Sequence, residues 1–176
     1  MDLIELLRAR RDAILSRSFD LVAETYAHET SSFLKREADP FSNPVGKTIR
    51  EALEGLLKAL IEGGTHAAFR QALEGLLRVR AVQTPRASEA LAFMGFLRRA
   101  IRDEMEAEST RESADRFLRE YLLLEDRIEE AMLVACDLYV ESRQRIDEVR
   151  INEVKAREAS LSRLLRAVEA TEGERP

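Results

Sequence analysis

Apolar residues recur at a helical period over residues 113–170. This stretch contains neither Pro nor Gly, so nothing in it obliges a helix to end. At about 1.5 Å per residue it would form a rod of roughly 85 Å, whereas a domain of this size is only about 30–40 Å across. The pattern therefore predicts a C-terminal helix that leaves the globule in which it begins.

The apolar face of this predicted helix changes in width along its length. As far as residue 140 it is wide, and we expect a face that wide to be buried in the globule. Its members include Leu122, Leu123, Leu124, Ile128, Ala131, Met132, Val134, Ala135, Leu138 and Tyr139. Beyond Glu141 a narrow stripe remains, formed by Ile146, Val149, Ile151, Val154, Leu161, Leu165 and Val168.

The narrow stripe has the spacing of a weak coiled-coil seam. Val154, Leu161 and Val168 are seven residues apart, as the heptad repeat requires. A second series is interrupted at Glu158, where an apolar residue is missing. We expect the seam to pair with the same helix of a second chain, giving a homodimer. The alternative is a surface helix that folds back on its own domain.

The pattern before the long helix predicts further helices and no β segment, hence an all-α fold. These helices cover residues 2–26, 30–37, 44–62, 66–82 and 85–108. Asp2 is a plausible N-cap of the first helix. In the loop before the third helix, Asn43 followed by Pro44 is typical of an N-cap and a first helical position. Gly63, with the glycine after it, is expected to end that helix.

Two junctions bound the last of these helices. Thr84 and Pro85 are expected to supply its cap and its first turn. After it, residues 109–113 are expected to break or bend the chain before the long helix begins.

The composition agrees with a soluble helical protein. Apolar residues make up 45% of the 176-residue chain and charged residues 35%, with few glycines and prolines. The net charge of −5 argues against a nucleic-acid-binding domain, which is normally basic. No apolar run is long enough to span a membrane, and the charged N-terminus is unlike a signal peptide. We therefore expect a cytoplasmic location.

Few residues offer catalytic or metal-binding chemistry. The single cysteine, Cys136, excludes an internal disulfide and is expected to be a buried, inert thiol. Motifs that cradle phosphate or pair metal ligands are absent. His66, at the start of a predicted helix, is a weak candidate for a haem ligand. Its alternative is a boundary histidine kept neutral by the helix terminus. We predict no enzyme activity, no metal site and no resident cofactor.

Arg80 is unusual because it lies on the apolar face of a predicted helix. It either pairs with a carboxylate or lines a pocket, and the carboxylate pair is the preferred interpretation. If a ligand pocket exists, we expect it near Phe69, Arg80, Phe93 and Met132. Such a pocket would suit a lipid or an acid.

Three sequence blocks resemble a known family. They are FLKREADPFSNPVGKTIREALEGLLKAL at 33–60, LLRVRAVQTPRASEALAF at 76–93 and DLYVESRQRIDEVRINEVK at 137–155. Together they resemble the RsbRD N-terminal domain family, the sensory domain that precedes the STAS domain in stressosome proteins of the RsbR type. The resemblance covers nearly the whole chain, and none of its blocks is a catalytic motif.

The resemblance implies a globin-like helical bundle that is normally haem-free and dimeric. Such a domain is expected to pass a signal through its C-terminal helix to an output domain. On this basis residues 1–140 form the globin-like sensor domain and residues 141–176 the linker helix. The predicted function is a non-enzymatic sensor or adaptor in a stress response. The alternative is a haem- or small-ligand-binding sensor of the globin type.

The chain departs from the family pattern in two places. Residues 84–87 read TPRA where many relatives have an Asp-Phe-Ser-Pro-like turn, which weakens any signal-binding role of that turn. The chain also ends at Pro176 without a STAS domain. We therefore expect a stand-alone member that signals through a partner protein not identified by the sequence.

Overall fold

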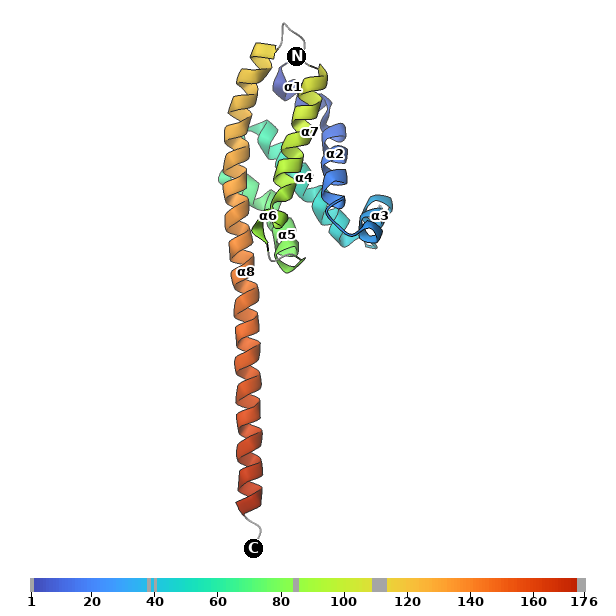
Figure 1. The fold of residues 1–176 in the computed structure, drawn as a ribbon. Coiled ribbons are helices and arrows are strands. Elements are labelled where there is room, and N and C mark those ends of the chain that lie inside the picture. The colour runs from blue at the N-terminus through green and yellow to red at the C-terminus, as the bar shows by residue number, and fades with distance from the viewer. Residues whose placement is uncertain (1, 38, 40, 84–85, 109–113, 174–176) are drawn as a thin grey trace.

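The computed structural model is built from helices, with no strand among the residues it describes (Figure 1). It describes residues 2–37, 39, 41–83, 86–108 and 114–173, and in the last range the side chains of residues 115–163. The helices are α1 (Leu3–Ala9), α2 (Arg11–Ala23), α3 (His28–Arg36), α4 (Pro44–Glu62), α5 (His66–Gln83), α6 (Ala87–Ala90), α7 (Ala92–Glu108) and α8 (Ala114–Gly173). The predicted all-α fold and long C-terminal helix are confirmed.

Two helices that the sequence predicts as single pieces are divided. The predicted helix at residues 2–26 is interrupted at Arg10, and the one at 85–108 is interrupted at Leu91. Both residues have backbone angles near φ −95° and ψ 0°, at the edge of the helical region (φ −101°, ψ 12° and φ −94°, ψ −3°). The predicted cap at Thr84 and Pro85 and the break at 109–113 lie outside the described residues.

The predicted caps at Asp2, Asn43 and Gly63 are confirmed. Asp2 accepts a hydrogen bond from the Glu5 backbone N–H, and the Glu5 side chain accepts one from the Asp2 backbone N–H. The Asn43 side chain accepts from the N–H of Gly46 at 2.8 Å and donates to two carbonyls at the end of α3. Gly63 ends α4 in the left-handed region, at φ 73°.

The core lies between three pairs of helices. α8 packs along α5, α4 packs across α5, and α2 lies beside α7. Large side chains at the centre, such as Leu57, Phe69 and Phe93, have no exposed surface. Burying each of these side chains contributes about 1.5–3 kcal/mol. The buried apolar residues form one hydrophobic core for the whole globule.

α8 belongs to this core only along its first half. Leu138 and Ser142 are buried and Ile146 still packs against the core, so the packing runs past the predicted boundary at 140. Residues 147–163 are all exposed, and Figure 1 shows this part as a rod that extends away from the globule. At about 1.5 Å per residue, the rod from residue 147 to Gly173 is roughly 40 Å long.

The expected burial of the whole wide face of α8 is wrong at two positions. Leu122 and Leu123 are 56% and 64% exposed. The globule covers only one side of α8. The apolar residues in this half of the helix occupy a wider arc than the covered side. Leucines beyond the contact with α5 and α7 therefore remain at the surface.

Candidate functional site

A stripe of exposed apolar side chains follows α8 along nearly its whole described length. We name it the outer stripe, and its members are Leu118, Leu122, Leu133, Val140, Ile151, Val154 and Leu161. All of them are more than half exposed. Because an α-helix turns by about 100° per residue, these side chains share one face, roughly 140° around the helix axis from the buried face. The outer stripe therefore does not face the globule.

The structure divides the predicted seam between two sides of α8. Ile146 packs against the core. Val149 comes seven residues after the buried Ser142, so it lies on the side of α8 that packs against the globule nearer the N-terminus of the helix. Ile151, Val154 and Leu161 lie on the outer stripe instead. The side chains of Leu165 and Val168 lie outside the described residues.

Sequence reasoning missed the part of the outer stripe that runs alongside the globule. The signal was present, because Leu133 and Val140 precede Val154 and Leu161 in the same seven-residue series, with Asp147 between them. It was hidden because the first half of α8 carries apolar residues on two sides, and the face expected to be buried included Leu122 of the outer stripe.

Charged residues interrupt the outer stripe. Asp147 and Glu158 fall at its heptad positions and are exposed. The Asp147 carboxylate lies 3.9 Å from an Arg143 guanidinium nitrogen and 4.0 Å from one of Arg150. Such surface pairs contribute little to stability. The outer stripe is thus an apolar surface with charged gaps rather than a continuous hydrophobic seam.

The candidate haem ligand His66 is an exposed residue at the first position of α5. Cys136 is half-buried rather than buried. Among the described residues, no group of three or more His, Cys, Asp and Glu side chains is arranged to hold a metal ion. In the same part of the chain, no helix is both long enough and apolar enough to cross a bilayer.

The four residues expected around one pocket do not share one. Phe69 and Phe93 are fully buried in the core. Met132 lines a hollow of about 310 Å³ between α7 and α8, which Met94 and Ile128 also line. Arg80 lines a different hollow, together with residues of α3 and with Ala92 at the start of α7. The sequence placed all four on helix faces but could not tell how those faces are stacked.

Arg80 is 5% exposed, and no ion pair among the described residues includes it. Its Nη2 donates to Thr25 Oγ1 at 3.3 Å, and its guanidinium carbon lies 5.1 Å from the centre of the Tyr26 ring. Its Nε is buried and has no hydrogen-bond partner among the described residues. The preferred sequence interpretation, a carboxylate pair, is therefore wrong, and the pocket alternative describes Arg80 better.

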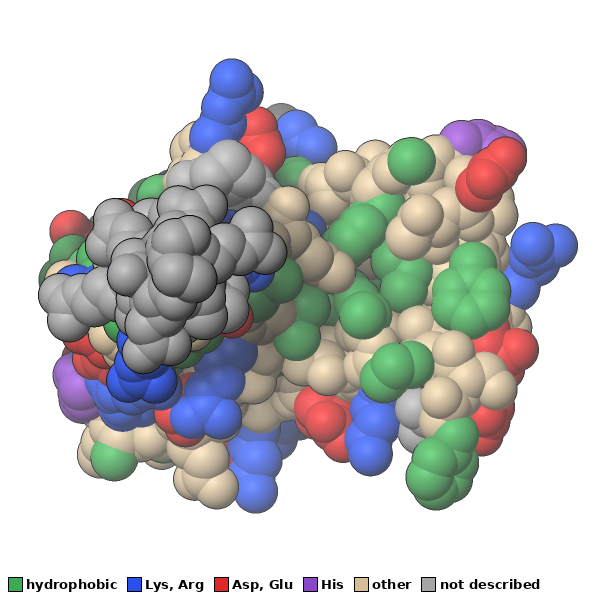
Figure 2. All heavy atoms as spheres, turned by 90° about the horizontal axis from the view of Figure 1, so that it is seen from below, with side chains coloured by type: hydrophobic (Ala, Val, Ile, Leu, Met, Phe, Trp, Pro, Cys, Tyr) green, Lys and Arg blue, Asp and Glu red, His purple; other side chains and the backbone are tan. Residues whose placement is uncertain are grey.

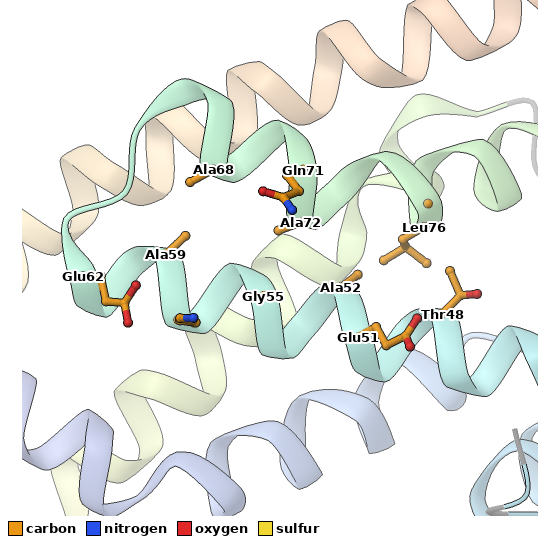
Figure 3. Close-up of a pocket in the computed structure, with 12 residues that line it drawn as sticks. Thr48, Glu51, Ala52, Gly55, Ala59, Glu62, Ala68, Gln71, Ala72 and Leu76 are labelled. Carbon is orange, nitrogen blue, oxygen red and sulfur yellow. The ribbon is translucent and has the colours of Figure 1, made fainter.

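A third hollow, of about 530 Å³, lies between α4 and α5 (Figure 3). Small residues from both helices line its middle, and a Cβ atom added to Gly55 would stand only 3.1 Å from the Ala72 Cβ. Glu51 and Glu62 lie toward its two ends. The small side chains account for the close approach of the two helices.

Arginines attach α8 to the rest of the globule. Arg70 on α5 donates to both carboxylate oxygens of Glu141, at 3.0 and 2.5 Å, and this hydrogen-bonded pair lowers the pKa of Glu141. Arg143 donates to the carbonyl of Ala81 at 3.1 Å, and Arg127 to that of Leu60 at 2.9 Å. Motion of α4 or α5 would therefore act directly on α8.

Residues 12–154 match the family model described as the RsbT co-antagonist protein rsbRD N-terminal domain. The chain belongs to this family. The match runs from α2 into the exposed part of α8, so it includes Arg80 and the outer stripe as far as Val154. No curated protein and no solved structure matches the chain. The function of this RsbRD N-terminal domain is therefore inferred from its own surfaces.

Proposed function

We propose that this RsbRD N-terminal domain is a non-enzymatic sensor or adaptor that forms a homodimer through the outer stripe of α8. Its output would be the position of the projecting part of α8, which a partner protein would contact. The observation that carries the proposal is the outer stripe. It continues from the globule onto a rod on which every residue from 147 to 163 is exposed.

The free energy available from the outer stripe fits such a dimer. Burying a side chain that is half exposed contributes about 1 kcal/mol. In a dimer, the three stripe residues on the rod, Ile151, Val154 and Leu161, would together supply on the order of 5 kcal/mol. This value is at the low end of the free-energy cost of association, which is about 4–15 kcal/mol. Adding the four members beside the globule, from Leu118 to Val140, gives on the order of 10 kcal/mol or more. Pairing therefore needs both halves of α8.

The same helix supplies a route for a signal. α8 is held to α5 by core packing and by the bonds of Arg70 and Arg143. A long helix moves as a stiff element, so a shift of α5 would change the position or rotation of the rod. The charged gaps at Asp147 and Glu158 keep the pairing on the rod weak enough to be shifted by a modest free energy.

We propose further that the domain works without haem. A haem ligand needs an apolar pocket around it, whereas His66 is exposed at the first residue of its helix. The test is the absorption spectrum after mixing the purified protein with haem. We expect the spectrum of free haem. A Soret band that is lost in His66→Ala would instead support the haem-binding alternative.

The dimer is tested by one substitution and a matched control on the same rod. Val154→Glu places a charge on the outer stripe, and Val149→Glu places it at a similarly exposed residue on the other side of the helix. Multi-angle light scattering at micromolar concentration should give a dimer for the wild type and for Val149→Glu, and a monomer for Val154→Glu. A monomeric wild type, or equal effects of the two substitutions, would contradict the proposal.

A further inference from the structure

Arg80 makes no ion pair with any carboxylate among the described residues. Arg80 is 5% exposed, and among the described residues its side chain donates one hydrogen bond, to the neutral hydroxyl of Thr25. Thr25 donates its own proton to the carbonyl of Val22 at 2.7 Å, so it serves Arg80 only as an acceptor. The Arg80 Nε–H has no acceptor in the described part of the chain. A buried cation without a counter-charge is destabilising, so the free site is incomplete.

A second feature beside Arg80 also attracts negative charge. Ala27 is the N-cap of α3, and its side chain cannot accept a hydrogen bond from the first turn. The first intrahelical bond of α3 runs from the Ser31 N–H to the Ala27 carbonyl. The backbone N–H groups before Ser31 therefore have no partner within the helix. They form the positive end of the α3 dipole.

Both features line one hollow of about 550 Å³, a volume suited to a small organic molecule. Ala27 and Thr30 come from α3, Arg80 and Gln83 from α5, and Ala92 from the start of α7. These segments meet at the lower end of the globule in Figure 1, and Figure 2 shows hydrophobic side chains gathered on this lower face. The Tyr26 ring, whose hydroxyl donates to Gln83 at 2.8 Å, adds an apolar surface over the guanidinium.

We propose that this hollow binds a small organic carboxylate, with the carboxylate between Arg80 and the N-terminus of α3. A carboxylate oxygen would accept from the Arg80 guanidinium, and the apolar body would lie against Tyr26 and Ala92. The planar guanidinium matches a carboxylate geometrically. The hollow is lined by one arginine and by one glutamate, Glu89, which pairs with Arg86 at 3.2 Å. This balance of charge favours a monoanion over a phosphate dianion.

The position of the site gives the ligand a route to α8. Ala81, the residue after Arg80, accepts the hydrogen bond that Arg143 of α8 donates. A carboxylate that draws Arg80 toward the hollow would therefore act on the segment of α5 that holds α8. The role of the ligand as an input signal rests on the proposed function. Its binding depends only on the geometry around Arg80.

The binding test uses pairs of acids and neutral amides on the full chain. The probes are sodium benzoate and sodium hexanoate, with benzamide and hexanamide as isosteres. Titration followed by thermal unfolding and by the NMR signal of the Arg80 Nε–H should show that at least one acid stabilises the protein and shifts this signal. We expect the matching amide to bind at least about tenfold more weakly, because it offers no charge to Arg80.

Two variants remove the site in different ways, with one control. Arg80→Met removes the cation while keeping the apolar stem, and Ala27→Asp places a carboxylate at the α3 N-cap while keeping Arg80. Both should fold and lose acid binding by at least about tenfold. Arg78→Met, at an exposed arginine on the same helix, should bind as the wild type does.

Three outcomes would overturn the ligand site: neither acid binds the wild type, acid and amide bind equally, or both site variants bind as the wild type does. Light scattering of the same samples separates this result from the proposed function. A dimer that binds no acid overturns only the ligand site. A monomer that binds acid through Arg80 keeps the site and overturns only the dimeric sensor.

Discussion

The two halves of α8 form one continuous helix but differ in apolar content and in surroundings. In the first half, residues such as Leu124 and Leu138 are buried against the globule at 2% exposure. In the second half, Val154 and Leu161 are more than half exposed, and no other described helix packs against them. Tertiary packing therefore stabilises the first half, whereas the second depends on helix propensity and side-chain pairs within the helix.

This difference explains why one helix can serve two purposes. The packed half is fixed to α5 by the Arg70–Glu141 pair and by the bond from Arg143 to the Ala81 carbonyl, and its Leu138 is buried in the core. An isolated helix of the length of the rod is only marginally stable in water, so the second half gains from any surface it can cover. The outer stripe connects the two halves, because it runs beside the globule and continues onto the rod.

The largest expected effect comes from truncating matched leucines in the two halves. Leu138→Ala should lower the free energy of unfolding of the globule by about 2–5 kcal/mol, because it leaves a cavity in the core. Leu161→Ala should change the unfolding of the globule by less than about 0.5 kcal/mol. Urea denaturation at a concentration low enough to keep the protein monomeric measures both. Equal losses would show that the rod packs against the globule.

A smaller effect is expected from filling the gap in the outer stripe. Glu158→Leu replaces the charge at a heptad position and should tighten the proposed dimer by about tenfold, or about 1.4 kcal/mol. Sedimentation equilibrium over a range of concentrations measures the change. Glu153→Leu, off the stripe on the same rod, is the control and should leave the dimer affinity unchanged. A weaker dimer in Glu158→Leu would mean that Glu158 makes a favourable contact.

The smallest effect concerns the ion pair where α8 is about to leave the globule. The hydrogen bonds from Arg70 lower the pKa of Glu141, so the pair stabilises the fold above the unfolded carboxyl pKa of about 4.3 and is lost as the pH falls. Arg70→Met should lower the melting temperature slightly at pH 7, and its difference from the wild type should shrink below about pH 4. Glu141→Gln should give the same pattern. A difference that is constant with pH would exclude the ion pair as its cause.

Local signals in the sequence predicted much of the fold. Asn43 with Pro44 marks the start of α4 correctly, and Gly63 marks its end, because caps depend on the backbone of a few adjacent residues. The departure of α8 from the globule followed from its length alone. The interruptions at Arg10 and Leu91 were not predicted, because no Gly or Pro stands at either position to signal a helix break.

The candidate sites were predicted less completely. Val154 and Leu161 follow from heptad spacing, and both lie on the outer stripe. The environment of Arg80 was not predictable, because Thr25 and Tyr26 are more than fifty positions away in the chain and reach it only in the folded bundle. Spacing along one helix carries no information about which other helix covers it.

The sequence by itself therefore determined the helices, their caps and a C-terminal helix too long for its globule, since these depend on contacts within a few residues. The tertiary structure alone decided which side of α8 is covered, and it left Leu122 and Leu133 exposed above the rod. It also decided that Arg80 is buried, with no ion-pair partner among the described residues, in a hollow that the start of α3 also lines. Both outcomes depend on how separate helices pack, which is settled by the shape of the whole core.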